Sequence, residues 1–402
     1  MKELQRKILW INPITFDMFL HQASNLEILR SMEKRGYSSI LITARSKRPI
    51  QIKESKVRII SVPLRFVRFL SSFLFAIGVF IFLPICILVS APQFLIVNQP
   101  DLSIFSLIPN LLFSKLRRIK FVLDIRSTIV EVNGFGAHAQ KLLFSISVLV
   151  AKKLFDGMTI ITSLMREEIC NAFEIDPRSV GVWSTGVNLD LFNPENYISD
   201  GIKLKRELGL CSKFVVFYHG VFGATRGLKE TVESMKVLRS EYPNTVLFLL
   251  GTGSILPTLK HLVQDEGLQE SVIFHDPVDY AEVPKFIEMS DVCIVPLPDH
   301  PYWRSQSPLK LLEYLAMEKT VIVTDIPAHR SVIGDEKCGI YASSAAPIEI
   351  AKSIVYAYHN KEKLTEWGKS GRTIVEEKYT WGKVAEDLEN YLLSINKASA
   401  RY

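Results

Sequence analysis

The sequence predicts an α/β protein built from two domains, each with a parallel sheet covered by helices on both faces. Residues 7–11 form an apolar run typical of a strand, residues 22–34 are predicted as a helix that Gly36 ends, and residues 38–43 are a second strand. This strand–helix–strand order is the opening of a doubly wound fold. A chain of 402 residues is long enough for two or three domains that each bury a core.

The alternation of strands and helices continues along the chain. Short apolar runs bounded by turn residues are typical of buried strands, and longer runs are typical of helices. In the first half we predict strands at residues 57–62, 93–99, 120–125, 158–162 and 180–184, and helices at 103–116 and 144–155. In the second half we predict strands at residues 213–218, 246–250, 272–275 and 292–296, and a last helix over 380–394.

The composition is that of a globular protein, with 48% hydrophobic and 22% charged residues. The net charge of +6 is compatible with phosphorylated ligands or an anionic membrane face, and it does not call for nucleic acid. The five cysteines are scattered without a CxxC pair, so we expect reduced thiols in a cytosolic setting and no metal site. We expect no signal peptide, because residues 4–11 lead directly into the first strand.

One stretch after the strand at residues 292–296 carries the strongest chemical signal. Ser307 is placed to cap a helix, and Pro308 would occupy its first position, where proline is favoured. The first turn would point free N–H groups at the sheet edge, and Lys310 adds a full charge to that anion site. Glu313, one turn further on, suits the hydroxyls of a ribose. Together these features describe a nucleoside diphosphate site, and the alternative is an ordinary capped helix with an exposed lysine and glutamate.

The pattern Ser307-Pro308-x-Lys310-x-x-Glu313-Tyr314-x-Ala316, followed by residues 319–324, resembles the donor-binding segment of family 4 retaining glycosyltransferases. The resemblance covers nearly the whole chain and implies the GT-B fold, in which two Rossmann-like domains face each other across a cleft. It implies an acceptor domain over residues 1–190, a nucleotide-sugar domain over residues 191–379, and a C-terminal helix over residues 380–402 that crosses back to the first domain.

The resemblance also assigns roles in the nucleotide-sugar domain. Arg226 matches one of the two basic residues that grip the diphosphate, whereas Val221 stands where the other is expected. Arg226, Lys310 and Glu313 are therefore the candidate catalytic residues, although an arginine in such a loop is otherwise an ordinary solvated residue. Ser305 replaces a glutamate that contacts the transferred sugar in the family. The candidate donor-binding residues are Gly220, Asp276, Pro277, Val278, Ser305, Ser307, Pro308 and Leu309. The loop Gly251-Thr252-Gly253 lies along the cleft edge in the family, and phosphate binding and simple packing are equal alternatives for it.

Four residues of the first half are acceptor-side candidates. Asn12 follows the first strand, and Asp124 and Arg126 lie at the end of the strand at residues 120–125, where open α/β sheets bind ligands. An internal ion pair between Asp124 and Arg126 is the alternative. His138 belongs to residues 133–138, which we interpret as a flexible loop able to close over the acceptor.

Residues 69–91 contain no charge, and Arg65 and Arg68 precede them. By length this run qualifies as a membrane-spanning helix. The strands predicted on both sides of it belong to one sheet in the expected fold, so we favour a helix lying in the membrane interface. A buried crossover helix and a spanning helix remain alternatives.

The function that we predict is transfer of a hexosyl group, with retention, from a nucleotide sugar to a lipid-linked saccharide in cell-surface polysaccharide synthesis. No metal and no cofactor is expected, and the co-substrate would be a UDP- or GDP-sugar. The enzyme would be cytoplasmic and peripheral at the membrane face. The alternatives are a non-catalytic GT-B scaffold, which Val221 and Ser305 keep open, and a nucleotide-sugar 2-epimerase, for which acid–base residues are sparse.

Overall fold

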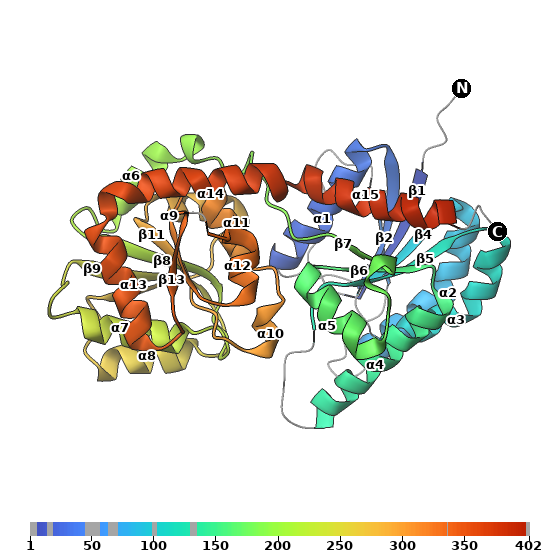
Figure 1. Ribbon diagram of the computed structural model, residues 1–402, viewed down its shortest axis with the longest axis horizontal. Coiled ribbons are helices and arrows are strands. Elements are labelled where there is room, and N and C mark those ends of the chain that lie inside the picture. The colour runs from blue at the N-terminus through green and yellow to red at the C-terminus, as the bar shows by residue number, and fades with distance from the viewer. Residues whose placement is uncertain are drawn as a thin grey trace. The chain divides into compact units, whose positions relative to one another are not determined.

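The computed structural model describes residues 6–13, 19–44, 57–62, 71–98, 103–128, 135–335 and 337–398 (Figure 1). The chain divides into two compact units. The N-terminal unit comprises residues 1–185 together with residues 381–402, and the C-terminal unit comprises residues 186–380. The sequence analysis placed these divisions at residues 190 and 379. Each unit contains one parallel sheet with helices on both faces, so the predicted fold class is confirmed.

The N-terminal unit has a seven-stranded sheet in the order β3-β2-β1-β4-β5-β6-β7. The chain moves outward from β1 to β3 and then returns to the other side of β1 with β4, so β1 and β4 form a topological switch point. The strands are β1 (Arg6–Asn12), β2 (Tyr37–Ala44), β3 (Arg58–Val62), β4 (Phe94–Asn98), β5 (Lys120–Ile125), β6 (Gly157–Ile160) and β7 (Val180–Val182).

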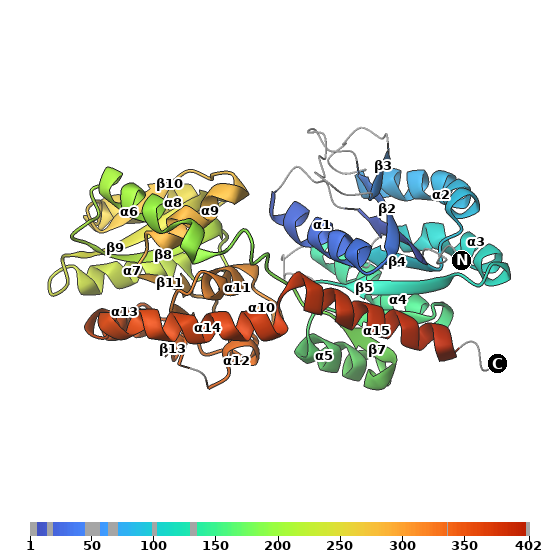
Figure 2. The same ribbon diagram turned by 90° about the horizontal axis from the view of Figure 1, so that it is seen from above.

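Helices cover both faces of this sheet (Figure 2). One face packs against α1 (Phe19–Lys34) and the last helix of the chain, α15 (Trp381–Ala398). The other face packs against α2 (Ser71–Ser90), α3 (Ser103–Leu116), α4 (Phe135–Leu154) and α5 (Ser163–Phe173). The flexible loop predicted over residues 133–138 is wrong in its second part, because residues 135–138 form the first turn of α4. Residues 133 and 134 lie outside the described residues.

The C-terminal unit has a six-stranded parallel sheet in the order β10-β9-β8-β11-β12-β13. Here the switch point lies between β8 and β11, because the chain runs from β8 outward to β10 and returns with β11. The strands are β8 (Phe214–Val221), β9 (Thr245–Thr252), β10 (Val272–His275), β11 (Val292–Val295), β12 (Val321–Thr324) and β13 (Gly339–Ala342).

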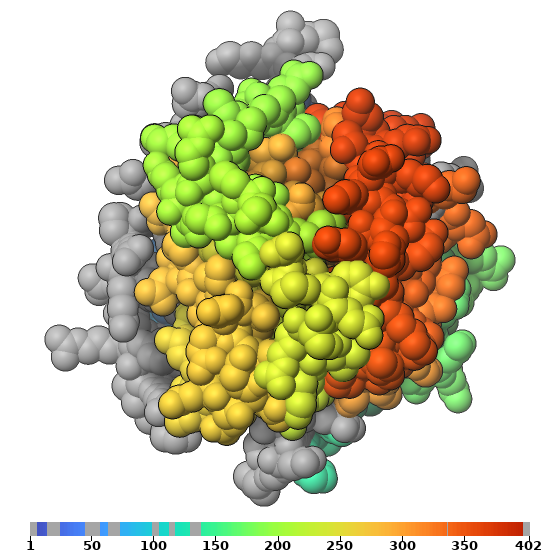
Figure 3. Space-filling model, turned by 90° about the vertical axis from the view of Figure 1, so that its left-hand side faces the viewer, coloured from blue at the N-terminus to red at the C-terminus, as the bar shows by residue number. Residues whose placement is uncertain are grey.

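Two apolar layers flank the C-terminal sheet. Figure 3 shows the surface of this unit, where the red segment that includes α13 lies beside the yellow-green α7. One layer contains α7 (Leu228–Leu238), α8 (Leu256–Asp265) and α13 (Pro347–His359). The other contains α6 (Ile198–Glu207), α9 (Val283–Glu288), α10 (Pro301–Arg304), α11 (Leu309–Ala316), α12 (Pro327–Ile333) and α14 (Leu364–Lys378).

The start of α11 differs from the prediction by one residue. The helix begins at Leu309, and Pro308 is its N-cap, with an extended ψ of 103°. Among the residues that the structure describes, no side chain makes a capping hydrogen bond there, so the prediction that Ser307 caps the helix is wrong. The first turn of α11 is consequently left without a side-chain partner for its N–H groups, which favours an anion at this end.

Candidate functional site

The carboxyl ends of β8 and β11 meet at the switch point of the C-terminal sheet, which is where open α/β sheets bind ligands. β8 ends in His219-Gly220-Val221. β11 is followed by α10 and by the loop that leads into α11. Lys310 reaches the end of β8, because a Cβ on Gly220 would lie 3.3 Å from its Nζ. The two predicted donor-binding segments therefore meet at this point.

Lys310 lies against a tyrosine that the sequence analysis did not single out. Its Nζ donates to the Tyr218 hydroxyl at 3.1 Å and lies 4.4 Å from the centroid of the same ring. Burial lowers the pKa of the Lys310 ammonium, and the nearby positive charge of Arg226 lowers it further. A bound phosphate would restore a favourable environment for this cation, so the geometry suits an anionic ligand.

Arg226 belongs to the loop that joins β8 to α7. Its guanidinium carbon lies 5.0 Å from the centroid of the Trp303 ring, and Trp303 Nε1 donates to the Thr225 carbonyl at 2.6 Å. Trp303 is thus a residue of α10 that holds the Arg226 loop from the β11 side. The structure brings Arg226, Lys310 and Gly220 together, and the link through Trp303 was not visible in the sequence.

Three glycine positions make this close approach possible. Gly227 has a φ of +70°, and a Cβ there would lie 1.9 Å from the Pro296 carbonyl oxygen. A Cβ on Gly251 would lie 2.0 Å from the Gly220 carbonyl oxygen, and one on Gly253 would lie 2.2 Å from that of Phe222. The loop Gly251-Thr252-Gly253 therefore packs directly against the end of β8, in agreement with the packing alternative.

Glu313 lies beneath this region and is fully buried. Its Oε1 accepts a hydrogen bond from the Tyr280 hydroxyl at 2.5 Å, and its Oε2 lies 3.0 Å from His219 Nε2. The His219 backbone N–H donates to the Tyr314 hydroxyl at 3.0 Å. The alternative of an exposed glutamate is therefore wrong. Tyr280 and His219 were not among the residues predicted for the site, although His219 is adjacent to the candidate Gly220.

The remaining donor-side candidates surround this centre. Ser305 is buried, Ser307 and Pro308 are half-buried, and Leu309 opens α11. Asp276 and Pro277 are exposed beyond the end of β10, and Val278 packs against the core. The hydrogen bond from Tyr280 to Glu313 connects this last segment to α11. Among the described residues, no group of three or more His, Cys, Asp or Glu is placed to hold a metal ion.

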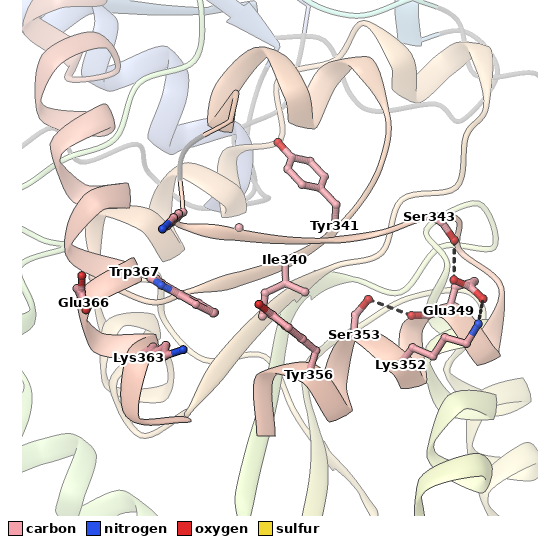
Figure 4. Close-up of a pocket in the computed structure, with 12 residues that line it drawn as sticks. Ile340, Tyr341, Ser343, Glu349, Lys352, Ser353, Tyr356, Lys363, Glu366 and Trp367 are labelled. Atoms are coloured by element: carbon pink, nitrogen blue, oxygen red, sulfur yellow. Dashed lines mark hydrogen bonds and ion pairs between the residues drawn. The ribbon is translucent and has the colours of Figure 1, made fainter. Parts of the chain in front are cut away.

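A separate pocket of about 840 Å³ lies at β13, at one end of the C-terminal sheet (Figure 4). Ile340 of β13, Tyr356 of α13 and Trp367 of α14 line it. The Glu349 carboxylate at its rim accepts hydrogen bonds from Ser343 Oγ at 2.6 Å and from Lys352 Nζ at 2.7 Å. The candidate donor-binding residues do not line this pocket, so it is distinct from the site at the switch point.

In the N-terminal unit, a row of buried polar side chains crosses the carboxyl edge of the sheet. The strand register pairs Thr43 with Asn12, Asn98 with Asp124, and Asp124 with Thr159. Asn12 and Asn98 each follow the last paired residues of β1 and β4, Ile11 and Val97, and so flank the switch point. Asn98 accepts a hydrogen bond from Trp10 Nε1 and donates to Asn25 of α1 at 3.2 Å. The row consists of Thr43, Asn12, Asn98, Asp124 and Thr159, all of them buried. Two acceptor-side candidates, Asn12 and Asp124, therefore belong to one polar layer.

Besides the ion pair considered above, Asp124 and Arg126 each form hydrogen bonds with other residues. Asp124 Oδ1 accepts hydrogen bonds from Thr159 Oγ1 at 2.7 Å and from Trp183 Nε1 at 2.9 Å. Arg126 donates to the carbonyls of Trp183 at 2.6 Å and Ser184 at 3.2 Å. Its guanidinium carbon lies 3.5 Å from the centroid of the Trp183 ring. The Trp183 segment thus holds both candidates in place, whereas His138 is exposed on the first turn of α4.

Burial raises the pKa of Asp124 to about 6, although Arg126 and the two hydrogen bonds oppose the shift. The ordinary pKa of this carboxyl is 3.8. Between these values the folded state binds more protons than the unfolded state, so the stability contributed by this group falls as the pH rises through the window. The loss amounts to about 3 kcal/mol at neutral pH, since each pKa unit corresponds to about 1.4 kcal/mol.

Replacement of Asp124 by asparagine is expected to abolish this pH dependence. Asparagine can still accept both hydrogen bonds, and Asp124 Oδ2 has no hydrogen-bond partner among the described residues. Amide hydrogen exchange of β5 and β6, corrected for intrinsic rates, would measure local stability between pH 4 and pH 7. The exposed Asp265→Asn on α8 is the matched control. A wild-type profile as flat as that of Asp124→Asn would contradict the prediction.

Comparison with solved structures identifies the fold of the chain. A solved glycosyltransferase structure from Rickettsia africae ESF-5 matches 98% of this chain and 99% of its own chain, with a TM-score of 0.77 and 15% identity. The structure of Anabaena HepE in complex with UDP and glucose matches 97% of this chain and all of its own chain, with a TM-score of 0.74 and 12% identity. At these identities the likeness establishes the fold, and the chain has the GT-B fold.

Comparison with known sequences indicates the family that the chain resembles. Residues 203–374 match the family described as Glycosyl transferases group 1, and the match lies within the C-terminal unit. The D-inositol 3-phosphate glycosyltransferase of Paenarthrobacter aurescens (strain TC1) is 23% identical over 231 residues, which are 56% of this chain and 54% of that protein. The chain spans about half the length of the curated relatives that it matches. These findings support the resemblance to the group 1 glycosyltransferases.

Proposed function

We propose that this protein transfers a hexosyl group from a nucleoside-diphosphate sugar to a saccharide acceptor. The observation that carries the proposal is the cluster of Lys310, Arg226 and the uncapped N-terminus of α11 at the switch point of the C-terminal sheet. Two cations and free N–H groups suit a diphosphate. The match of residues 203–374 to the group 1 glycosyltransferases supports the same conclusion.

In the proposed reaction, Lys310, Arg226 and the N-terminus of α11 stabilise the negative charge that develops on the departing diphosphate. The acceptor hydroxyl attacks the sugar carbon on the face that the diphosphate leaves, and a leaving phosphate oxygen takes the proton of this hydroxyl. This route retains the configuration of the sugar and corresponds to the family 4 assignment. It requires no metal, since the protein's own cations provide the charge stabilisation.

Glu313 is proposed to act at the ribose end of the donor site. Because its carboxylate is buried between Tyr280 and His219, a ribose would have to replace the Tyr280 or His219 contact in order to bind it directly. If the ribose does not replace either contact, Glu313 instead holds Tyr280 and the end of β8 in position. A UDP- or GDP-sugar is the proposed donor. HepE, which shares the fold, was solved with UDP and glucose.

The proposed acceptor is a lipid-linked saccharide of cell-surface polysaccharide synthesis, bound at the polar row of the N-terminal unit. Asn12 and Asp124 lie at the carboxyl edge of this sheet, where open α/β sheets bind ligands. Because both side chains are buried, they would support the acceptor site from beneath. A lipid-linked acceptor would place the protein at the cytoplasmic face of the membrane, as a peripheral protein.

The proposal is tested by incubating the purified full chain with UDP-, GDP-, dTDP- and ADP-sugars, with and without EDTA, and with membrane lipid extract as acceptor. We expect nucleotide release from one donor, unaffected by EDTA and increased by the extract. In the same assay, a donor whose ribose is replaced by 2′-deoxyribose can be compared with the unmodified nucleotide sugar. Equal rates of nucleotide release would indicate that Glu313 has the positioning role. Donor binding without release would indicate a non-catalytic scaffold, and no binding of any donor would overturn the site.

A further inference from the structure

α2 presents apolar side chains on two opposite faces. One face packs into the core against the sheet, through Phe75, Val79, Leu83 and Ile87. The opposite face is exposed and equally apolar, and its members are spaced as on one side of a helix. These exposed residues are Phe73, Ile77, Phe80, Ile81, Ile85, Leu88 and Val89, with exposed fractions from 38% to 77%. Core packing therefore accounts for only half of the apolar surface of this helix.

The neighbouring helix α3 extends this exposed surface. Ser106 Oγ of α3 donates a hydrogen bond to the Ala76 carbonyl of α2 at 2.7 Å, so the two helices lie side by side, as Figure 2 also shows. On α3, Phe105 and Ile108 are exposed as well. We call the nine exposed apolar residues of the two helices the α2–α3 surface. Large contiguous apolar patches on a protein surface commonly mark an interaction site.

The topology argues against a helix that crosses the membrane. The segment Phe73–Ser90 is long and apolar enough to span a bilayer, with a mean hydropathy of 2.8. However, α2 connects β3 to β4, and both strands belong to the same seven-stranded sheet. A spanning helix would separate the two strands by the thickness of the bilayer. The exposed face of α2 can therefore meet lipid only from one side of the membrane.

The segment of the chain that carries this surface is strongly positive. Residues 55–120, which contain both helices, include eight Lys or Arg residues and a single acidic residue, Asp101. Their net charge is +7, and because the whole chain carries +6, all other residues together carry −1. Among the described residues of this segment, Arg58, Arg117 and Arg118 are exposed. Arg65, Arg68 and Asp101 lie outside the described residues. The positive charge of the protein is thus concentrated in the segment that carries the exposed apolar side chains.

We propose that the α2–α3 surface docks into the interface of a bilayer that contains anionic lipids. An apolar helix face bordered by basic residues combines burial in the acyl boundary with attraction to anionic headgroups. A soluble protein partner would explain the apolar face but not the excess positive charge around it. This inference does not depend on the proposed transfer reaction, since it concerns a different surface and different residues.

The first test compares vesicle binding of three forms of the full chain. The triple variant Ile81→Ser, Ile85→Ser, Leu88→Ser removes exposed apolar groups without touching the core face of α2. The matched control is Ile198→Ser, Ile202→Ser on α6, where the two side chains are 52% and 56% exposed. On vesicles of phosphatidylcholine with one quarter phosphatidylglycerol, we expect at least tenfold weaker sedimentation for the triple variant and wild-type binding for the control. Pure phosphatidylcholine or added salt should weaken wild-type binding.

A second measurement locates the contact directly. Phe80→Trp keeps an apolar aromatic side chain at a position that is 52% exposed, and its fluorescence can be quenched by lipids brominated along the acyl chain. We expect added quenching relative to the wild type, which has its own tryptophans. No added quenching, or equal vesicle binding by the triple variant and wild type, would overturn the proposal. Self-association in solution that the triple variant abolishes, without vesicle binding, would assign the surface to a second copy instead.

Discussion

Replacing Lys310 by alanine is expected to reduce the rate of nucleotide release from the donor sugar by at least 100-fold. Lys310 lies at the end of β8 beside Gly220 and near Arg226, and its ammonium is partly desolvated. Removing one group that stabilises developing negative charge in an active site typically costs 10²–10³ in rate. The loss should be large here because β8 ends in Val221, at a position where the family resemblance implies a second cation, so Arg226 alone would remain.

The controls for this prediction distinguish the loss of the Lys310 charge from a loss of folded structure. Lys229→Ala on α7 removes an exposed lysine that pairs with Glu233 at 3.7 Å, and it should change the rate by less than twofold. Lys310→Arg retains the charge and should recover part of the activity. Unfolding midpoints of the variants establish that each is folded. Turnover by Lys310→Ala within threefold of wild type would show that the charge at this position does not act on the departing group.

Much of the fold could be predicted because the strands are short apolar runs ended by turn residues. The predicted ranges of β5, β10 and α3 coincide with the observed ones. The start of α11 was missed by one residue because it depends on the ψ angle of Pro308, which the residue type does not determine. The sequence also left open whether α2 is interfacial, buried or membrane-spanning. A helix that is apolar all round has no polar face to indicate which side packs on the sheet.

The candidate site could be predicted only in part. Gly220, Arg226 and Lys310 belong to local patterns, and the structure brings them together. Their partners come from distant parts of the chain: Tyr280 is 33 residues from Glu313, and Tyr218 is 92 residues from Lys310. No local spacing encodes such contacts. In the N-terminal unit, the polar row depends on the strand register, which places Asn12, Asn98 and Asp124 side by side although nothing connects them in sequence.

The second large effect is expected when Gly227 is replaced by alanine. The same replacement at Gly209 is the control that separates the cost of the backbone conformation from the cost of the steric conflict. The two glycines have nearly the same left-handed φ angle, +70° at Gly227 and +69° at Gly209. A Cβ on Gly209 would meet no atom of the described residues within 4 Å, whereas one on Gly227 would lie 1.9 Å from the Pro296 carbonyl oxygen. Gly209→Ala should therefore destabilise the C-terminal unit only by the cost of a left-handed alanine, about 1–2 kcal/mol. Gly227→Ala carries the same cost together with the steric conflict.

We expect Gly227→Ala to destabilise the protein by about 3 kcal/mol or more, because the β8–α7 loop must move away from the end of β11. The same movement would displace Arg226, the preceding residue, so nucleotide release should fall at least tenfold under conditions in which the variant is folded. Urea unfolding and the donor assay on both variants measure the two effects. Equal stability and equal activity of Gly209→Ala and Gly227→Ala would show that the loop tolerates a side chain, and that the close approach of Gly227 to Pro296 does not position Arg226.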